Sequence, residues 1–157
     1  MEKIGAKLFI LIIILIAFSF AGYEPWKVPY EVEGKWKIID DSTGIPIAKT
    51  RIWIKNDTLF GTIEEINRNS GINDVCTLCT DSLKDKSFVG MRFMWGFVEK
   101  NNSWVKGRML DLQNGKVYKA DLTLSPDRET LFVFTYVRFL IKVGRTQKWV
   151  KDSVETQ

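Results

Sequence analysis

The only two cysteines of this 157-residue chain, Cys76 and Cys79, stand two residues apart in the stretch NDVCTLCTD. A Cys-x-x-Cys pair can be a redox centre, half of a metal site or a local disulfide. The flanking Asp74 and Asp81 disfavour the thiolate, which is the reactive form of cysteine. The surrounding sequence also lacks the alternating strands and helices that carry thioredoxin-like motifs. A structural disulfide is therefore the favoured interpretation, with redox exchange and metal binding as alternatives.

The chain contains no histidine. This composition excludes Ser-His-Asp catalysis, Cys-His catalysis and histidine-ligated metals. Zinc would need carboxylates such as Asp74 and Asp81 beside the two thiolates. Acidic residues occur on most of the predicted strands, but nothing in the sequence marks one pair as an acid–base couple. We therefore predict no catalytic residues, no metal site and no cofactor. A carboxylate with a raised pKa inside a cavity would be the sign of an enzyme.

The N-terminal residues have the composition of an export signal. MEKIGAK carries two lysines, and LFILIIILIAFSF is an apolar run of 13 residues. Ser19 and Ala21 occupy the small-residue positions of an A-x-A-like cleavage site. A membrane-spanning helix needs about 20 apolar residues, so an uncleaved anchor is the weaker alternative. We predict a signal peptide over 1–21, no membrane span after cleavage, and export to the periplasm or the outside of the cell.

The rest of the chain is only mildly basic. Removing residues 1–21 takes Glu2, Lys3 and Lys7 away from 19 acidic and 23 basic residues, which leaves a net charge of +3. The basic residues are scattered rather than grouped into the stripe or patch of a nucleic-acid footprint. We therefore expect no nucleic-acid partner. Export would also place the two cysteines where disulfides persist.

Eight short runs rich in β-branched and aromatic residues are separated by turn residues. They cover 35–40, 47–55, 58–66, 87–100, 103–112, 116–124, 130–139 and 142–150. Alternation within the runs and short connections between most of them predict antiparallel strands paired in chain order. We predict an all-β fold, an eight-stranded antiparallel up-and-down barrel over 34–152. An extended leader at 22–33 precedes it and a tail at 153–157 follows it; a two-sheet sandwich is the alternative.

The fourth run, 87–100, breaks the alternation because apolar side chains fall on both of its faces. These are Val89, Met91, Phe93 and Trp95 on one face, and Phe88 and Met94 on the other. A strand covered on its outside by the long loop or the leader explains this pattern most simply. The alternative is an exposed apolar face that pairs with a second copy of the chain through 88–97.

Gly34-Lys35-Trp36 opens the first run, and Arg145 lies in the last one. This pair is similar to the end-closing arrangement of lipocalin-like barrels. There the Trp plugs the closed end and the Arg lies across its ring, a cation–π contact worth roughly 0.5–2 kcal/mol. The resemblance therefore assigns barrel closure to Trp36 and Arg145.

A longer series of motifs runs GKWKIIDDSTG, CTLCTD, MWGF, GRMLDLQNGKVY and GRTQKW. It resembles a family of exported bacterial proteins, domain of unknown function 2147, over about residues 34–152. The resemblance implies export and a lipocalin-type barrel, and it leaves the activity open. The chain departs from the family pattern at Leu112, where proline is common. It also departs in YVRFLIKVG, where smaller residues are common.

Binding of a small apolar or amphipathic ligand is the leading functional hypothesis, because a barrel of eight strands is either packed or holds one small ligand. Side chains alternate between the two faces of a strand, so the face that carries Trp36 and the apolar faces of the other runs should point inward. The candidate lining residues are Ile38, Ile52, Ile54, Phe93, Trp95, Met109, Tyr118 and Phe134. Ordinary core packing is the alternative for each of them. The second hypothesis is an envelope structural or interaction protein with a filled barrel. It would contact partners through the fourth run or through the leader at 26–30.

Overall fold

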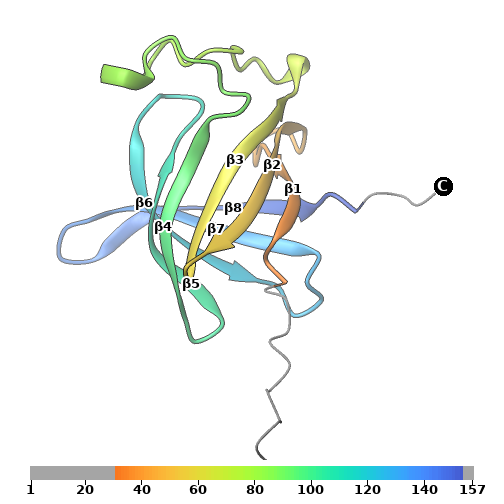
Figure 1. Ribbon diagram of the computed structural model, residues 1–157, viewed down its shortest axis with the longest axis vertical. Helices are drawn as coiled ribbons and strands as arrows, with labels where there is room; N and C mark the ends of the chain where they lie inside the picture. Colours follow the sequence, from red (N-terminus) through yellow and green to blue (C-terminus); the bar gives the residue numbers. More distant parts are fainter. Residues whose placement is uncertain (1–30, 154–157) are drawn as a thin grey trace, which may run out of the picture.

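The computed structural model of the protein describes residues 31–153. Eight antiparallel strands, each hydrogen-bonded to its neighbours in chain order, close into one barrel (Figure 1). They are β1 (Gly34–Ile39), β2 (Pro46–Lys55), β3 (Thr58–Ile66), β4 (Arg92–Lys100), β5 (Ser103–Leu110), β6 (Val117–Leu124), β7 (Thr130–Arg138) and β8 (Lys142–Lys151). The pairing of β8 with β1 closes the barrel. The predicted fold class is therefore confirmed.

Parts of the predicted organisation fall outside the described residues: the signal peptide over 1–21, the leader up to residue 30, and the tail after residue 153. No helix within residues 31–153 is long and apolar enough to cross a membrane. The described end of the leader belongs to the barrel. Val32 is buried, and its carbonyl accepts a hydrogen bond of 2.9 Å from the Trp36 indole.

Connections at the two ends of the barrel differ in length. At the end that we call the base, the turns 56–57 and 101–102 join their strands in two residues. All four of these residues are Asn or Asp at positive φ, the conformation that a tight hairpin turn requires. The other end, which we call the mouth, carries the connections 40–45, 67–91, 111–116 and 139–141. The long connection 67–91 contains two short 3-10 helices, η1 (Arg68–Ser70) and η2 (Asp81–Leu83).

Strand β4 begins at Arg92, later than the sequence predicted, because Gly90 turns the chain at a φ of 85°. The register between β3 and β4 then shifts twice. Such an irregularity lets consecutive side chains face the same way, and Phe93 and Met94 are both buried. This explains the broken alternation that the sequence shows in this run.

Glycines on the neighbouring strands make room for these large side chains. A Cβ on Gly61 would lie 2.4 Å from Met94 Cγ, and one on Gly107 would lie 2.2 Å from Phe97 Cδ1. The apolar surplus of β4 therefore fills the barrel, while Val98 is exposed and Trp95 is half-buried. Most of the apolar surface that pairing through 88–97 would need is thus inside the molecule.

Candidate functional site

Side chains fill the interior of the barrel almost completely. Trp149 stacks on Phe93 with 5.9 Å between ring centroids, and Trp36 is fully buried nearer the base. The cavity that remains measures about 20 Å³, which is room for about one water molecule. It is lined by Ile38, Ile47, Phe93, Met109, Leu110, Asp111, Leu112, Gln113, Arg145, Gln147 and Trp149. This inner cavity has no space for a whole ligand.

The predicted lining residues divide into several groups. Ile38, Phe93 and Met109 line the inner cavity, as their parity indicated. Ile52 is fully packed in the core, and Ile54 packs against it, with its backbone N–H donating to Glu33 Oε1 at 2.6 Å. Neither isoleucine lines the inner cavity.

Two of the predicted lining residues, Trp95 and Phe134, lie on the outer face of the barrel. Trp95 pairs with the exposed Arg108, because the irregular register of β4 moves it out of the predicted parity. Phe134 stacks on Tyr136 at 5.2 Å, beside the inward-facing Val133 and Thr135. The smaller residues of β7 face inward, so choosing its aromatic face as the lining was wrong.

The predicted contact of Arg145 with the Trp36 ring is wrong, although Trp36 is fully buried near the base. Trp36 pairs with Lys151 at the base, and the cation over its ring is Lys151, at 5.9 Å from the centroid. Arg145 pairs with Thr135 in the half of β8 nearer the mouth. Its Nη2 forms an ion pair of 3.1 Å with Asp111 Oδ2, which holds the guanidinium at the mouth.

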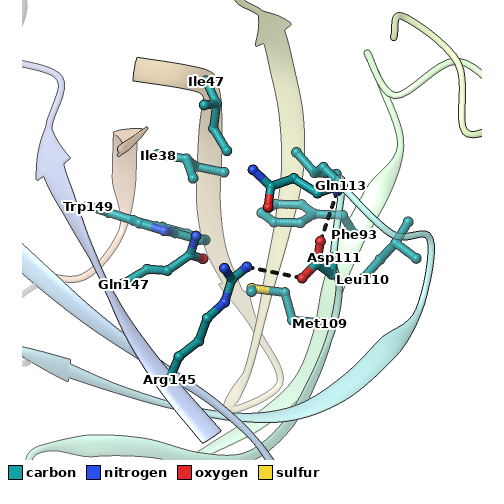
Figure 2. A pocket seen from close by; sticks show the side chains of 11 residues that line it. Ile38, Ile47, Phe93, Met109, Leu110, Asp111, Gln113, Arg145, Gln147 and Trp149 are labelled. Atoms are coloured by element: carbon teal, nitrogen blue, oxygen red, sulfur yellow. Dashed lines mark hydrogen bonds and ion pairs between the residues drawn. The ribbon is translucent and has the colours of Figure 1, made fainter. Parts of the chain in front are cut away.

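Alternate residues on the inner face of β8 form a polar column: Arg145, Gln147 and Trp149 (Figure 2). Trp149 Nε1 is buried and has no hydrogen-bond partner within residues 31–153. Gln147 is only 6% exposed, and no hydrogen bond joins its side-chain amide to another described residue. A buried donor without a partner, such as Trp149 Nε1, is rare in folded proteins and costs free energy. The column therefore presents unused hydrogen-bonding groups to the inner cavity.

The connection 111–116 faces this column from across the cavity, and Gln113 points toward it from that side (Figure 2). Asp111 Oδ1 accepts the Gln113 backbone N–H at 2.8 Å, and Gln113 Nε2 donates to Asp40 Oδ2 at 3.3 Å. Asp40 also accepts hydrogen bonds from Ser42 and Thr43 in its own turn, which lowers its pKa to about 2. Two connections of the mouth are thus joined through Gln113.

Two larger clefts open from the same place. The mouth cleft, of about 360 Å³, is lined by Asp111, Gln113, Asn114, Tyr118, Thr135, Tyr136, Val137, Val143, Gly144 and Arg145. The loop cleft, of about 300 Å³, is lined by Ser70, Gly71, Ile72, Asn73, Val75, Cys76, Thr77, Leu78, Phe88, Leu112 and Gln113. Tyr118 is the one predicted lining residue in the mouth cleft. Gln113 borders both clefts and the inner cavity, so the three spaces adjoin.

The two cysteines form a disulfide and are both buried in the connection 67–91. The backbone next to them packs on the connection 111–116: a Cβ on Gly115 would lie 2.5 Å from the carbonyl carbon of Leu78. Burial keeps an exchanging thiol away from the sulfurs, which favours a structural role over a redox one. Within residues 31–153 there is also no cluster of three Cys, Asp or Glu side chains that could hold a metal. The disulfide therefore holds one wall of the loop cleft.

Replacing both cysteines by alanine is expected to lower the free energy of unfolding by about 2 kcal/mol, the loop-closure value for so short a crosslink. The loss should appear as a lower urea midpoint, and reduction of the parent protein should reproduce it. Equal midpoints for parent, reduced parent and the double variant would contradict a structural role for this bond.

The residues that complete the site were missed from the sequence: Asp111, Gln113 and Gln147. Gln147 left a signal, because it alternates with Trp149 and Arg145 in GRTQKW and so shares their inward face. A polar residue at an inward position between them could have been noticed. Asp111 and Gln113 lie in a turn, where the position of a side chain depends on the folded chain.

Comparisons with known proteins agree with this architecture. In structure the chain is similar to protein HP1028 from the human pathogen Helicobacter pylori, which belongs to the lipocalin family. The TM-score is 0.66 at 15% sequence identity, over 78% of this chain and 84% of that one. No curated protein matches the sequence significantly. The model of the family DUF2147, described as an uncharacterized protein conserved in bacteria, matches residues 34–151. The chain therefore belongs to the DUF2147 family, with a lipocalin-like barrel as its fold.

Proposed function

We propose that the protein is an exported binding protein, and not an enzyme, which takes the polar head of a small amphipathic ligand at the mouth of the barrel. The observation that carries the proposal is the buried, unpartnered N–H of Trp149 at the inner cavity. A group that leaves a buried donor unpaired gives up stability, unless water or a ligand supplies the missing acceptor.

The polar column determines the chemistry of the head. The indole of Trp149 and the guanidinium of Arg145 can only donate hydrogen bonds, while the amide of Gln147 can donate and accept. A head that accepts hydrogen bonds fits these groups, and a carboxylate gains most because its bond with an arginine is charge-assisted. Asp111 engages Nη2 of Arg145, and the guanidinium has further donors to offer.

The sizes of the adjoining spaces determine the rest of the ligand. The inner cavity has room only for a group about the size of one water molecule, whereas the mouth cleft has the volume of an ordinary small-molecule site. Val137, Val143 and Tyr118 give that cleft apolar walls. We therefore propose a single-chain amphiphile, with its head on the polar column and its chain in the mouth cleft.

Export is part of this proposal and rests on the N-terminal sequence. Residues 1–21 carry lysines, an apolar run and small residues in the order of a signal peptide. A disulfide between Cys76 and Cys79 agrees with an oxidising compartment, the periplasm or the cell exterior. N-terminal sequencing of the protein recovered from its producing cell tests the cleavage, and an intact Met1 would contradict it.

Calorimetric titration with dodecanoate tests the ligand site. The parent protein should bind it, and Arg145→Met should weaken binding by about 10- to 100-fold, the value of a charge-assisted hydrogen bond. Lys148→Met is the matched control, because Lys148 is an exposed cation on the outer face of the same strand. No binding by the parent protein, or equal losses for the two variants, would contradict the proposed site.

The filled interior favours a second function, an envelope interaction module. A barrel packed with its own side chains can act as a rigid support for a contact surface. The segment 88–97 offers little for such a contact, because Phe88, Phe93, Met94 and Phe97 are buried. A protein that sediments as a dimer and does not bind dodecanoate would favour this function over ligand binding.

A further inference from the structure

The hairpin between β7 and β8 carries the most exposed large apolar side chains of residues 31–153. At its tip, Phe139 is 92% exposed, Leu140 99% and Ile141 70%. Val137 and Val143, on the stems just below, are more than half exposed as well. The hairpin extends well beyond the barrel on the left of Figure 1. We call residues 137–143 the apolar hairpin.

Its exposure is a property of the backbone. The connection 139–141 is tight, with the N–H of Phe139 donating to the carbonyl of Ile141 at 3.2 Å. So short a turn cannot fold its side chains back onto the barrel, and all three project outward. Isolated apolar residues on a surface are ordinary, but five within seven positions form a patch, and such patches mark interaction sites.

Cations flank this patch. Arg138 and Lys142 stand on either side of the tip, and the exposed Lys119 lies on the adjacent strand β6, opposite Tyr136. Lys142 forms an ion pair with Asp121, and its ammonium lies 4.4 Å from the centroid of the Tyr136 ring. Because this ion pair neutralises both Lys142 and Asp121, the excess positive charge near the tip comes from Arg138 and Lys119.

We propose that the apolar hairpin inserts into the surface of an anionic lipid bilayer. A projecting tip with splayed side chains offers no flat face to a second copy of the chain, whereas the acyl boundary of a bilayer accepts an apolar tip of any shape. Arg138 and Lys119 would then lie at the level of the anionic headgroups, each worth about 1 kcal/mol of attraction, while Lys142 stays paired with Asp121.

This insertion does not depend on the proposed ligand, although it would bring the mouth cleft to the membrane. Val137 and Val143 belong both to the hairpin stems and to the wall of that cleft. The start of the described chain lies at the base, at the opposite end of the barrel. The hairpin therefore inserts from the end of the barrel opposite to the point where the described chain begins.

A fluorescent probe at the tip tests the insertion. The native cysteines are buried in a disulfide, so Leu140→Cys can be labelled selectively with a nitrobenzoxadiazole probe. Vesicles of equimolar phosphatidylglycerol and phosphatidylcholine should raise its fluorescence severalfold and shift the emission to the blue. Lys100→Cys, labelled in the same way near the base, is the control and should not respond. An unresponsive probe at position 140, or a larger response at position 100, would overturn the proposal.

Two further variants assign the binding energy to the hairpin. The triple variant F139S/L140S/I141S should lose vesicle binding while keeping the thermal midpoint of the parent, because the replaced side chains are exposed. Arg138→Gln should weaken binding to the anionic vesicles by about fivefold, and salt should weaken the parent in the same way. A triple variant that co-sediments with vesicles as the parent does would overturn the proposal. A tip response without vesicles that follows protein concentration would assign the hairpin to self-association and also overturn it.

Discussion

Trp149→Ala is expected to lower the free energy of unfolding by about 3–5 kcal/mol, the usual cost of removing a fully buried aromatic side chain. Trp149 is completely buried, pairs with Leu131 on one side and Ile38 on the other, and stacks on Phe93. Its removal would join a large void to the inner cavity, because the surrounding strands are held by the closed barrel. Urea denaturation with an unchanged m-value measures this loss.

Trp53→Ala is the matched control for this variant. Trp53 lies on the outer face and stacks on Phe60 at 5.7 Å, so its loss leaves no internal void. It should cost much less than Trp149→Ala. Trp149→Phe keeps a buried ring and removes the unpartnered N–H, so its cost should also be small. Equal losses at Trp149 and Trp53 would contradict a barrel filled by its own side chains.

Gly115→Ala is expected to cost about 2–5 kcal/mol, from a left-handed conformation and a backbone collision together. Gly115 has a φ of 69°, and a Cβ there would lie 2.5–2.6 Å from backbone atoms of Leu78 and Cys79. Backbone held by a disulfide cannot move aside as the end of a flexible side chain can. The connection 67–91 should therefore lift from the mouth, and this should raise its susceptibility to proteolysis.

Gly71→Ala separates the two costs. Gly71 has nearly the same φ, 73°, but a Cβ there would meet nothing within 4 Å. It should therefore show only the conformational cost, roughly 1–2 kcal/mol. The difference between the two variants, read from urea midpoints, measures the contact between the two connections. If the two alanines cost the same, the disulfide segment does not rest on Gly115.

The strand pattern could be predicted because it depends on the local sequence. Alternation and the Asn-Asp and Asn-Asn turns of the base placed every strand except the start of β4 to within two residues. The start of β4 was not predicted correctly because Gly90 lies among apolar residues that are typical of a strand. Its two register shifts and the glycines of β3 and β5 that make room for its large side chains come together only in the folded barrel.

The site could be predicted only in part. The alternation of side chains identified Phe93 and Met109 as inward-facing. Alternation does not tell whether large side chains fill a barrel or line a hollow one. The partner of Arg145 could not be found either, because Asp111 precedes it by 34 residues and reaches it through a turn. Family resemblance pointed instead to Trp36, which the fold places nearer the base.

The central claim of this account is that ligands bind at the mouth, on the polar column, while the rest of the barrel stays filled. The indole N–H of Trp149 reports on it directly in proton–nitrogen correlation spectra, and Trp149→Phe identifies its signal among those of the six tryptophans. Titration with dodecanoate should shift the Trp149 signal and leave that of the deeply packed Trp36 in place. A Trp149 signal that stays fixed throughout the titration would contradict the account.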